Sequence, residues 1–420
     1  MNFTPTELGA SIIFAIAVVH TFCTSYFETL AKHSRRHSGL LHLLGEVEIV
    51  FGFWAAILII FMWLANDLAT AKEYANKRNF TEPLFVFAIM VVAGSKPILH
   101  FATQILHKLG KALQLVLRTK QAPTLYFLTL SITPLLGSLI TEPAAMTLAA
   151  FLLRDLVYRH KCSTPLLFGT LGVLFVNISI GGTLTNFAAP PVLMVASTWD
   201  WDSAFMFNNF GLEATIAIFI NAIAVTLIFH KQLIEPEGKS EATHIPPMIT
   251  AIHLLFLAGI VGFAHDPVIF MWLLLFFIGY TTAYPKHQSP LILREALLVG
   301  FFLGGLVVLG GLQGWWLQPI LETMSPTAVF YGSLALTALT DNAALTYLGS
   351  LVQGTSPEFK LALVGGAVAG GGLTVIANAP NPAGLAILRN HFPNAAVSAG
   401  LLLIAAIPPT IVAILAFRLL

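Results

Sequence analysis

The chain has 420 residues, of which 57% are hydrophobic and only 10% are charged, and its mean hydropathy is +0.82. This composition excludes a soluble globular protein and indicates an all-α membrane protein that crosses the bilayer many times. The formal net charge of +1 gives no basic surface for nucleic acid, and no nucleotide-binding glycine motif occurs. We therefore expect a lipid bilayer as the surroundings, no nucleic-acid partner, and transport driven by an ion gradient.

Hydropathy divides the chain into two halves on either side of a charged linker, residues 231–247. Each half is predicted to contain three spans, a re-entrant hairpin, a span broken at Gly and Pro residues, and one further span, which gives about ten transmembrane helices and two hairpins. In residues 1–230 these elements are the spans 8–27, 43–64 and 83–106, the hairpin 123–153, the broken span 166–197 and the span 210–229. In residues 248–420 they are the spans 248–264, 268–283 and 295–312, the hairpin 326–353, the broken span 361–388 and the span 395–417.

The basic residues indicate how the two halves are oriented. Lys120 and Arg154 lie at the two ends of the first hairpin, and because Lys and Arg concentrate in cytoplasmic loops, both ends are expected inside. With this assignment, 15 of the 21 Lys and Arg residues lie inside, 5 lie outside, and Lys96 lies within the membrane. The first half then begins outside, with the N-terminus, whereas the second begins inside. The halves are therefore predicted to be inverted-topology repeats.

A polar motif, Thr-acid-X-Ala-Ala, occurs once in each predicted hairpin, at residues 141–145 and 340–344. An ionisable group at membrane depth is costly and usually marks an ion path. We therefore expect Glu142 and Asp341 to occupy equivalent hairpin tips and to take part in ion binding. The alternative interpretation is that each acid caps a helix or faces water.

Each broken span contains the pattern Gly-Gly-X-Leu-Thr, followed by Asn, Ala and Pro. The glycines either allow close helix packing or, together with Asn and Pro, free carbonyls and helix ends to face an ion. Oxygen-rich, partly dehydrated sites suit a hard cation, and we expect Na+ to bind at Asp341, Glu142, Asn186 and Asn378. The full predicted set of ion-binding and coupling residues is Asp341, Glu142, Asn342, Thr340, Thr141, Asn186, Thr185, Asn378, Asn381 and Thr374.

Lys96 stands in the middle of the third predicted span, within Gly94-Ser95-Lys96-Pro97. Its ammonium group could pair with a tip carboxylate, contact a substrate anion or carry a proton. The alternative is a lysine that extends its side chain to the membrane surface. The sequence leaves these roles open.

Paired hairpins with broken helices resemble the ion transporter superfamily, which includes NhaD-type Na+/H+ antiporters, arsenite pumps and divalent-anion/sodium symporters. Within it the chain is most similar, over nearly its whole length, to the family named putative Na+/H+ antiporter. The resemblance is carried by residues 340–344, similar to the Asp-Asn tips of NhaD-type members, and by Glu142. The Ser-Asn-Thr tips of dicarboxylate symporters are absent from both hairpins. The resemblance implies a two-domain protomer that forms a homodimer, with hairpins and broken helices in its transport domain.

These features predict a secondary transporter that exchanges Na+ or Li+ for H+ across a bacterial inner (cytoplasmic) membrane, with no cofactor besides the transported ions. A carboxylate that binds Na+ as the anion and H+ as the acid would make the two cations compete for one site. The alternative is an anion/sodium symporter or metalloid exporter of the same superfamily. An intramembrane enzyme is disfavoured because no HExxH or GxSxG motif occurs, and a pure channel is disfavoured by the paired carboxylates.

Overall fold

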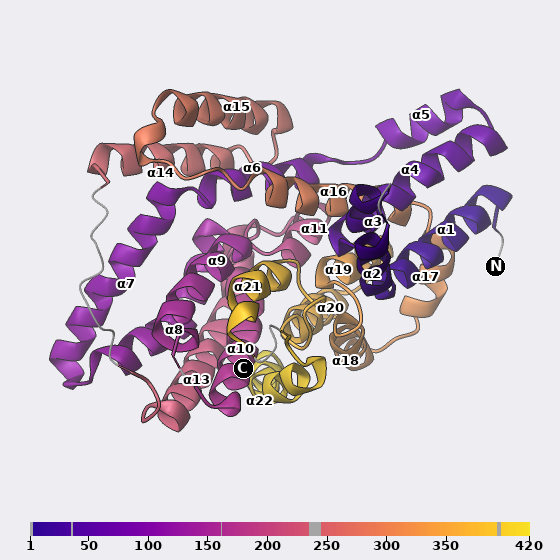
Figure 1. Ribbon diagram of the computed structural model, residues 1–420. Helices are drawn as coiled ribbons and strands as arrows, with labels where there is room; N and C mark the ends of the chain where they lie inside the picture. Colours follow the sequence, from indigo (N-terminus) through magenta and orange to yellow (C-terminus); the bar gives the residue numbers. More distant parts are fainter. Residues whose placement is uncertain (1–2, 35–36, 161, 235–244, 393–395) are drawn as a thin grey trace.

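The computed structural model describes residues 3–34, 37–160, 162–234, 245–392 and 396–420, which form helices joined by short connections (Figure 1). No strand occurs in this described part of the chain, so the predicted all-α class is confirmed. Seven of the described helices are long and apolar enough to cross a membrane, or eight if one bent pair counts as a single span. The protein is an all-α polytopic membrane protein.

One group of helices, which we call the scaffold bundle, runs along the top and right of Figure 1. Its helices pack through aromatic and small residues: the rings of Phe51 and Phe302 meet edge to face at 5.2 Å, and Gly305 lets the backbones of two helices approach closely at Gly52. Two short apolar helices belong to this group. Its members are α1 (Pro5–Phe22), α2 (Thr24–His33), α3 (Ser38–Leu44), α4 (Val47–Ala65), α5 (Leu68–Asn76), α6 (Thr81–Ala93), α14 (Pro247–Gly262), α15 (Pro267–Ala283), η4 (Pro285–His287) and α16 (Leu293–Gly310).

The second group, the core bundle, fills the space below the scaffold bundle in Figure 1. It contains two helical hairpins and two broken helices. The hairpins are α8 (Gln121–Ile140) with α9 (Glu142–Leu153) and η1 (Arg154–Tyr158), and α18 (Pro326–Thr337) with α19 (Asn342–Ser350). The broken helices are α10 (Thr164–Gly181), η2 (Gly182–Leu184) and α11 (Pro190–Trp199), and α20 (Pro357–Gly370), α21 (Pro380–Leu388) and η5 (Arg389–His391). The remaining members are α12 (Ser203–Met206), η3 (Phe207–Gly211), α13 (Leu212–Phe229) and α22 (Ala399–Leu419).

The third predicted span, 83–106, is not one straight helix. α6 ends at Ala93, and α7 (Lys96–Leu117) continues at an angle of 65° to it. Pro97 lies in the first turn of α7, where proline is well tolerated, but a proline there would disrupt a helix that ran on from α6. The sequence prediction was wrong at this point because it read hydropathy across a proline that begins a new helix.

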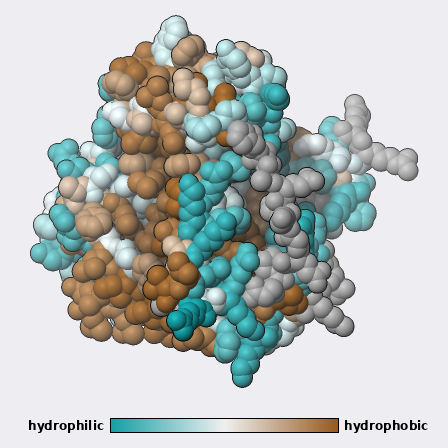
Figure 2. All heavy atoms as spheres, turned by 90° about the vertical axis from the view of Figure 1, so that its left-hand side faces the viewer, coloured by the Kyte–Doolittle hydropathy of each residue, from teal (hydrophilic) through white to brown (hydrophobic). Residues whose placement is uncertain are grey.

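α7 and α17 (Gly314–Leu321) connect the two bundles. α7 is amphipathic, with Gln104, Lys108 and Lys111 exposed beside the exposed apolar side chain of Leu115. It lies at the left of Figure 1, and Figure 2 shows this side of the molecule, where a hydrophilic strip runs down a largely hydrophobic surface. The order of elements from α6 to α13 is the same as that from α16 to α22, as a repeat requires. The sidedness of the elements stays a prediction.

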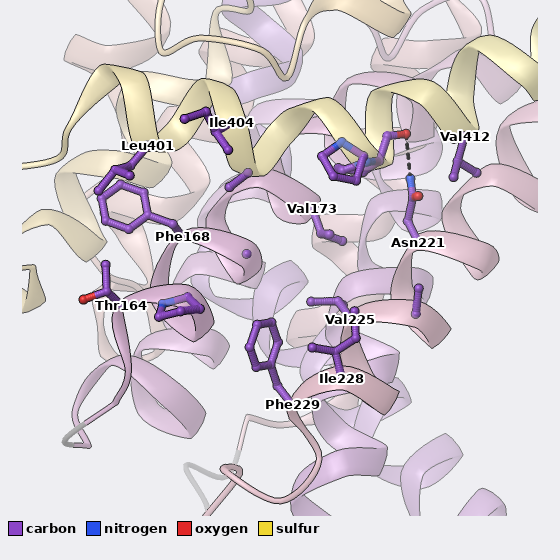
Figure 3. Close-up of a pocket in the computed structure, with 16 residues that line it drawn as sticks. Thr164, Phe168, Val173, Asn221, Val225, Ile228, Phe229, Leu401, Ile404 and Val412 are labelled. Carbon is purple, nitrogen blue, oxygen red and sulfur yellow. Dashed lines mark hydrogen bonds between the residues drawn. The ribbon is translucent and has the colours of Figure 1, made fainter.

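Two buried amides tie four helices of the core bundle together. The Asn177 amide nitrogen donates to the Leu130 carbonyl at 2.8 Å, and the Asn221 amide nitrogen donates to the Asn177 amide oxygen at 2.9 Å. Asn221 also donates to the Pro409 carbonyl of α22 at 3.3 Å, beside an apolar pocket of about 400 Å³ (Figure 3). These bonds fix α10 against α8, α13 and α22, and so position the break at its end.

Candidate functional site

The tip of the first hairpin docks inside the break between α10 and α11. α8 ends at Ile140, and Thr141 turns the chain with φ +76°, an unfavourable conformation for a β-branched residue. The backbone N–H of Glu142 donates to the Ala188 carbonyl at 3.3 Å. The Thr185 hydroxyl donates to the Ser138 carbonyl at 2.7 Å. The predicted site residues Thr141, Glu142 and Thr185 are therefore brought together.

The second hairpin docks in its own break through the same two contacts. The backbone N–H of Asn342 donates to the Ala377 carbonyl at 3.0 Å. The Thr374 hydroxyl donates to the Ala338 carbonyl at 3.0 Å. Since Asn342 takes the place that Glu142 takes in the first hairpin, the structure pairs Glu142 with Asn342, and the N-cap residue Thr141 with the N-cap residue Asp341.

Two glycines support this one-residue correction of the predicted Glu142–Asp341 equivalence. A Cβ atom on Gly182 would come within 2.5 Å of the Glu142 carboxylate, and one on Gly371 would come within 2.8 Å of the Asn342 amide. These glycines therefore allow each broken helix to approach the side chain at the hairpin tip. Matching the sequence motifs by residue type pairs Glu142 with Asp341. The backbone contacts instead pair Glu142 with Asn342.

The two breaks differ in polarity. Because Ala188 and Ala377 accept equivalent bonds, Asn378 corresponds to Ala189, and Asn381 corresponds to Val192. The neutral oxygen donors of the second break thus have apolar counterparts in the first. The site is built from unequal halves, with Glu142 of the first repeat facing the polar break of the second.

Asn186 does not join this arrangement. Its amide nitrogen donates to the Trp201 carbonyl at 3.0 Å, and its amide oxygen accepts from the Ser203 hydroxyl at 2.8 Å. Both polar ends of the side chain are thus used by the segment that follows α11. The structure does not bring Asn186 to Glu142 or Asn378, contrary to the predicted Na+ ligand set.

Both hairpin tips contact the second break, the first through the Glu142 side chain and the second through the backbone of Asn342. The Asn378 amide nitrogen donates to the Glu142 carboxylate at 2.9 Å, and both side chains are fully buried. The half-buried Asp341 carboxylate accepts from the N–H groups of Ala343 at 2.8 Å and Ala344 at 3.3 Å, and so caps α19. None of the ion pairs among the described residues involves either acid.

Several buried polar atoms at this junction have no hydrogen-bond partner among the described residues. Leaving such a group unpaired costs about 1–3 kcal/mol, so this cluster is a place where an ion or ordered water can bind. Most are oxygens, the donor atoms that hard cations prefer. They are Thr141 Oγ1, Glu142 Oε1, Asn342 Oδ1 and Nδ2, Asn378 Oδ1 and Asn381 Oδ1.

The remaining predicted residues have other surroundings. Lys96 is half-buried at the start of α7 and forms no ion pair with a described residue. Thr340 is also half-buried, and its hydroxyl donates to the Leu336 carbonyl at 3.1 Å. Asn381 holds the break by donating to the carbonyls of Gly371 at 2.8 Å and Thr374 at 2.9 Å.

Ser138 is a site residue that the sequence analysis missed. Its hydroxyl donates to the Gly181 carbonyl at 2.7 Å and accepts from the Leu184 N–H at 3.0 Å, which ties the hairpin to the end of α10. The available signal was a hydroxyl residue four positions before the buried acid Glu142, in a helix that also contains Thr124, Thr129, Ser131 and Thr133. Such residues often bond within their own helix, so position alone does not identify this role.

The model of the family described as "Putative Na+/H+ antiporter" matches residues 5–420 of the chain. The chain belongs to this family. A comparison with curated proteins found no match. Membership of the antiporter family, together with the apolar helices, makes the chain a multi-span membrane transporter of the cation/proton antiporter class.

The unequal breaks give the first prediction for this antiporter. Asn378→Ala is expected to weaken the apparent Na+ affinity about tenfold, because it removes a buried oxygen beside the Glu142 carboxylate. Asn186→Ala is the matched control and should leave the affinity unchanged, because its amide serves the segment after α11. The measurement is the Na+ dependence of proton flux in proteoliposomes that contain equal amounts of folded protein. Equal affinities in the wild type and Asn378→Ala would assign the second break to helix packing.

Proposed function

We propose that the protein exchanges Na+ or Li+ for H+ across a bacterial cytoplasmic membrane, with no cofactor besides the transported ions. The observation that carries this proposal is that both hairpin tips meet one helix break, where the Glu142 carboxylate bonds to Asn378 and the residue after Asp341, Asn342, bonds through its backbone to Ala377. The surrounding unpartnered oxygens suit a partly dehydrated monovalent cation. Family membership supports the same class of reaction.

Glu142 is the centre of the proposed cation site. One of its carboxylate oxygens is held by Asn378, and the other, Oε1, is left for a ligand. A buried carboxylate is costly unless its charge is compensated, so the site favours either a bound cation or a bound proton. Na+ and H+ then exclude one another at the same group. This competition gives exchange without a separate path for the proton.

Alternating access is the proposed way in which the site reaches both sides of the membrane. The hairpins and broken helices that build the site belong to the core bundle, which joins the scaffold bundle through α7 and α17. Movement of one bundle against the other would change the side to which the hairpin tips are open while their own contacts stay intact. Such movement needs no change within the docked tips.

The test is cation-dependent proton flux in proteoliposomes with Na+, Li+, K+ and dicarboxylates compared side by side. Saturable proton efflux driven by Na+ or Li+, with no response to dicarboxylates, is the expected result. Uptake of a dicarboxylate that requires Na+, or export of a metalloid oxyanion, would replace the exchange proposal with the anion/sodium symporter or metalloid exporter. Flux without saturation or counterflow would indicate a channel.

A further inference from the structure

A small pocket of about 20 Å³, lined by both polar and apolar residues, lies between the scaffold and core bundles. This volume is sufficient for one water molecule. Its polar lining comes from Glu82 on α6, Ser197 on α11, Asn186 in the first break, and His265 between α14 and α15. The predicted topology places Glu82, Ser197 and His265 near the outer ends of their spans and Asn186 within the broken span, although these segments are distant in sequence.

A hydrogen bond in this pocket joins the two bundles. The Ser197 hydroxyl donates to the Glu82 carboxylate at 2.5 Å, and the Asn79 amide donates to the same oxygen at 3.2 Å. Glu82 is only 9% exposed and lies in the first turn of α6, where the helix dipole stabilises a negative charge. Hydrogen bonds to an ionised group are about twice as strong as neutral ones.

The interface between the bundles has few other bonds of this kind. Within the described ranges, and apart from the connecting helices, the other side-chain hydrogen bond between the bundles is that from the Tyr347 hydroxyl to the Val307 carbonyl, at 3.1 Å. Val307 lies near the end of α16 that is predicted to face outside. Both of these side-chain hydrogen bonds therefore lie toward the side of the membrane that is predicted to be the outer one.

The pocket borders the first break, which holds the tip of the first hairpin. Phe85 and Phe187, which also line it, pack edge to face with their ring centroids 6.5 Å apart. Phe187 directly precedes Ala188, whose carbonyl holds the Glu142 hairpin tip. Separation of α6 from α11 at Glu82 and Ser197 would expose this aromatic pair and then the break behind it.

We propose that Glu82 and Ser197 form an outer latch, which holds α11 against α6 and opens when the transporter exposes its site to the outside. Glu82 acts in this step as a positioning residue, through Ser197, and does not need to touch the transported ion. The latch rests on the alternating-access part of the proposed function. It adds that the bond between Glu82 and Ser197 controls the opening of the site to the outside.

The experiment measures access to the pocket from outside. Cys23 and Cys162 are replaced by Ser, and Ala196, a buried residue in the pocket lining, is replaced by Cys. Cells are treated with a membrane-impermeant maleimide. Glu82→Gln and Ser197→Ala are each expected to raise the labelling rate of Cys at position 196 about tenfold, because each weakens the charge-assisted bond.

Three comparisons separate a latch from a general loosening of the fold. The double variant should label no faster than the faster single variant, since both changes remove one bond. Ser197→Thr, which keeps the hydroxyl, should label as slowly as the protein with Ser197. Glu73→Gln, at an exposed ion pair with Lys77, should leave the labelling rate unchanged. Unchanged rates in both single variants, multiplied effects in the double variant, or labelling only from inside-out vesicles would overturn the latch.

The same preparations distinguish this inference from the proposed function. Na+-dependent proton flux is measured in the protein without the latch substitutions. Absence of flux there would contradict exchange, whereas the labelling rates would still report whether the latch exists. Normal flux combined with unchanged labelling would overturn the latch alone.

Discussion

Gln in place of Glu142 is expected to abolish Na+-dependent proton movement while the protein stays folded. Gln keeps the size of the side chain and can still bond to Asn378, but it carries neither a negative charge for Na+ nor a titratable proton. Loss of a charged ligand from a buried site is expected to lower the exchange rate by about 100-fold or more at limiting Na+. The measurement is Na+-driven proton flux in proteoliposomes, with Na+ binding to the purified protein followed by calorimetry.

The competition between Na+ and H+ adds a pH dependence to this test. In the wild type, the apparent KM for Na+ should rise as the pH falls, because protonation of Glu142 removes the group that binds the cation. Glu358→Gln is the matched control, because Glu358 is an exposed acid in the first turn of α20. The Glu358→Gln variant should exchange Na+ for H+ at the wild-type rate. Wild-type flux and an unchanged pH dependence in Glu142→Gln would rule out Glu142 as the shared site.

The order of the elements could be predicted from the sequence because its signals are local. Long apolar runs gave the spans, Gly and Pro residues gave the breaks, and basic residues gave the expected orientation. The breaks after Gly181 and Gly370 and the turn at Thr141 lie where the sequence predicts them. The bend at Pro97 escaped the prediction because hydropathy does not register a helix that ends and restarts within an apolar run.

The composition of the site could not be predicted to the same degree, because it depends on contacts between distant residues. Glu142 and Asn378 are 236 positions apart and belong to different repeats. The carbonyls of Ala188 and Ala377, which set the hairpin register, belong to residues with no chemical signature. Asn186 matched the expected pattern, yet its amide is satisfied by the segment after α11.

The one-residue shift between the hairpins has a chemical consequence. Equivalent acids would have given two similar cation sites, one in each repeat. Instead, the position of Glu142 in the first hairpin is filled by the neutral Asn342 in the second, and the acid of the second hairpin stands at the helix cap. The two carboxylates therefore differ in their surroundings, and we expect them to differ in their roles.

Asp341→Asn tests whether exchange needs the charge of the second carboxylate, and it does so without disturbing the hairpin. Asn is as good a helix N-cap as Asp, so the bonds to the N–H groups of Ala343 and Ala344 should survive. What disappears is the negative charge of the residue that precedes Asn342, whose backbone bonds to the second break. Na+-driven proton movement is expected to be abolished, because the negative charge that attracts the cation to the hairpin tips is reduced. The measurement is proton flux in proteoliposomes, together with the folded fraction of the purified variant.

Asp202→Asn provides the control for this substitution. Asp202 also caps a helix, with its carboxylate accepting from the Phe205 N–H at 2.7 Å, but it lies in the exposed segment before α12. Its replacement should leave exchange unchanged, so any loss in Asp341→Asn belongs to the charge at the break and not to the cap. If Asp341→Asn exchanged at the wild-type rate with its usual pH profile, the carboxylate would serve only as a cap. Glu142 alone would then have to bind both cations in turn.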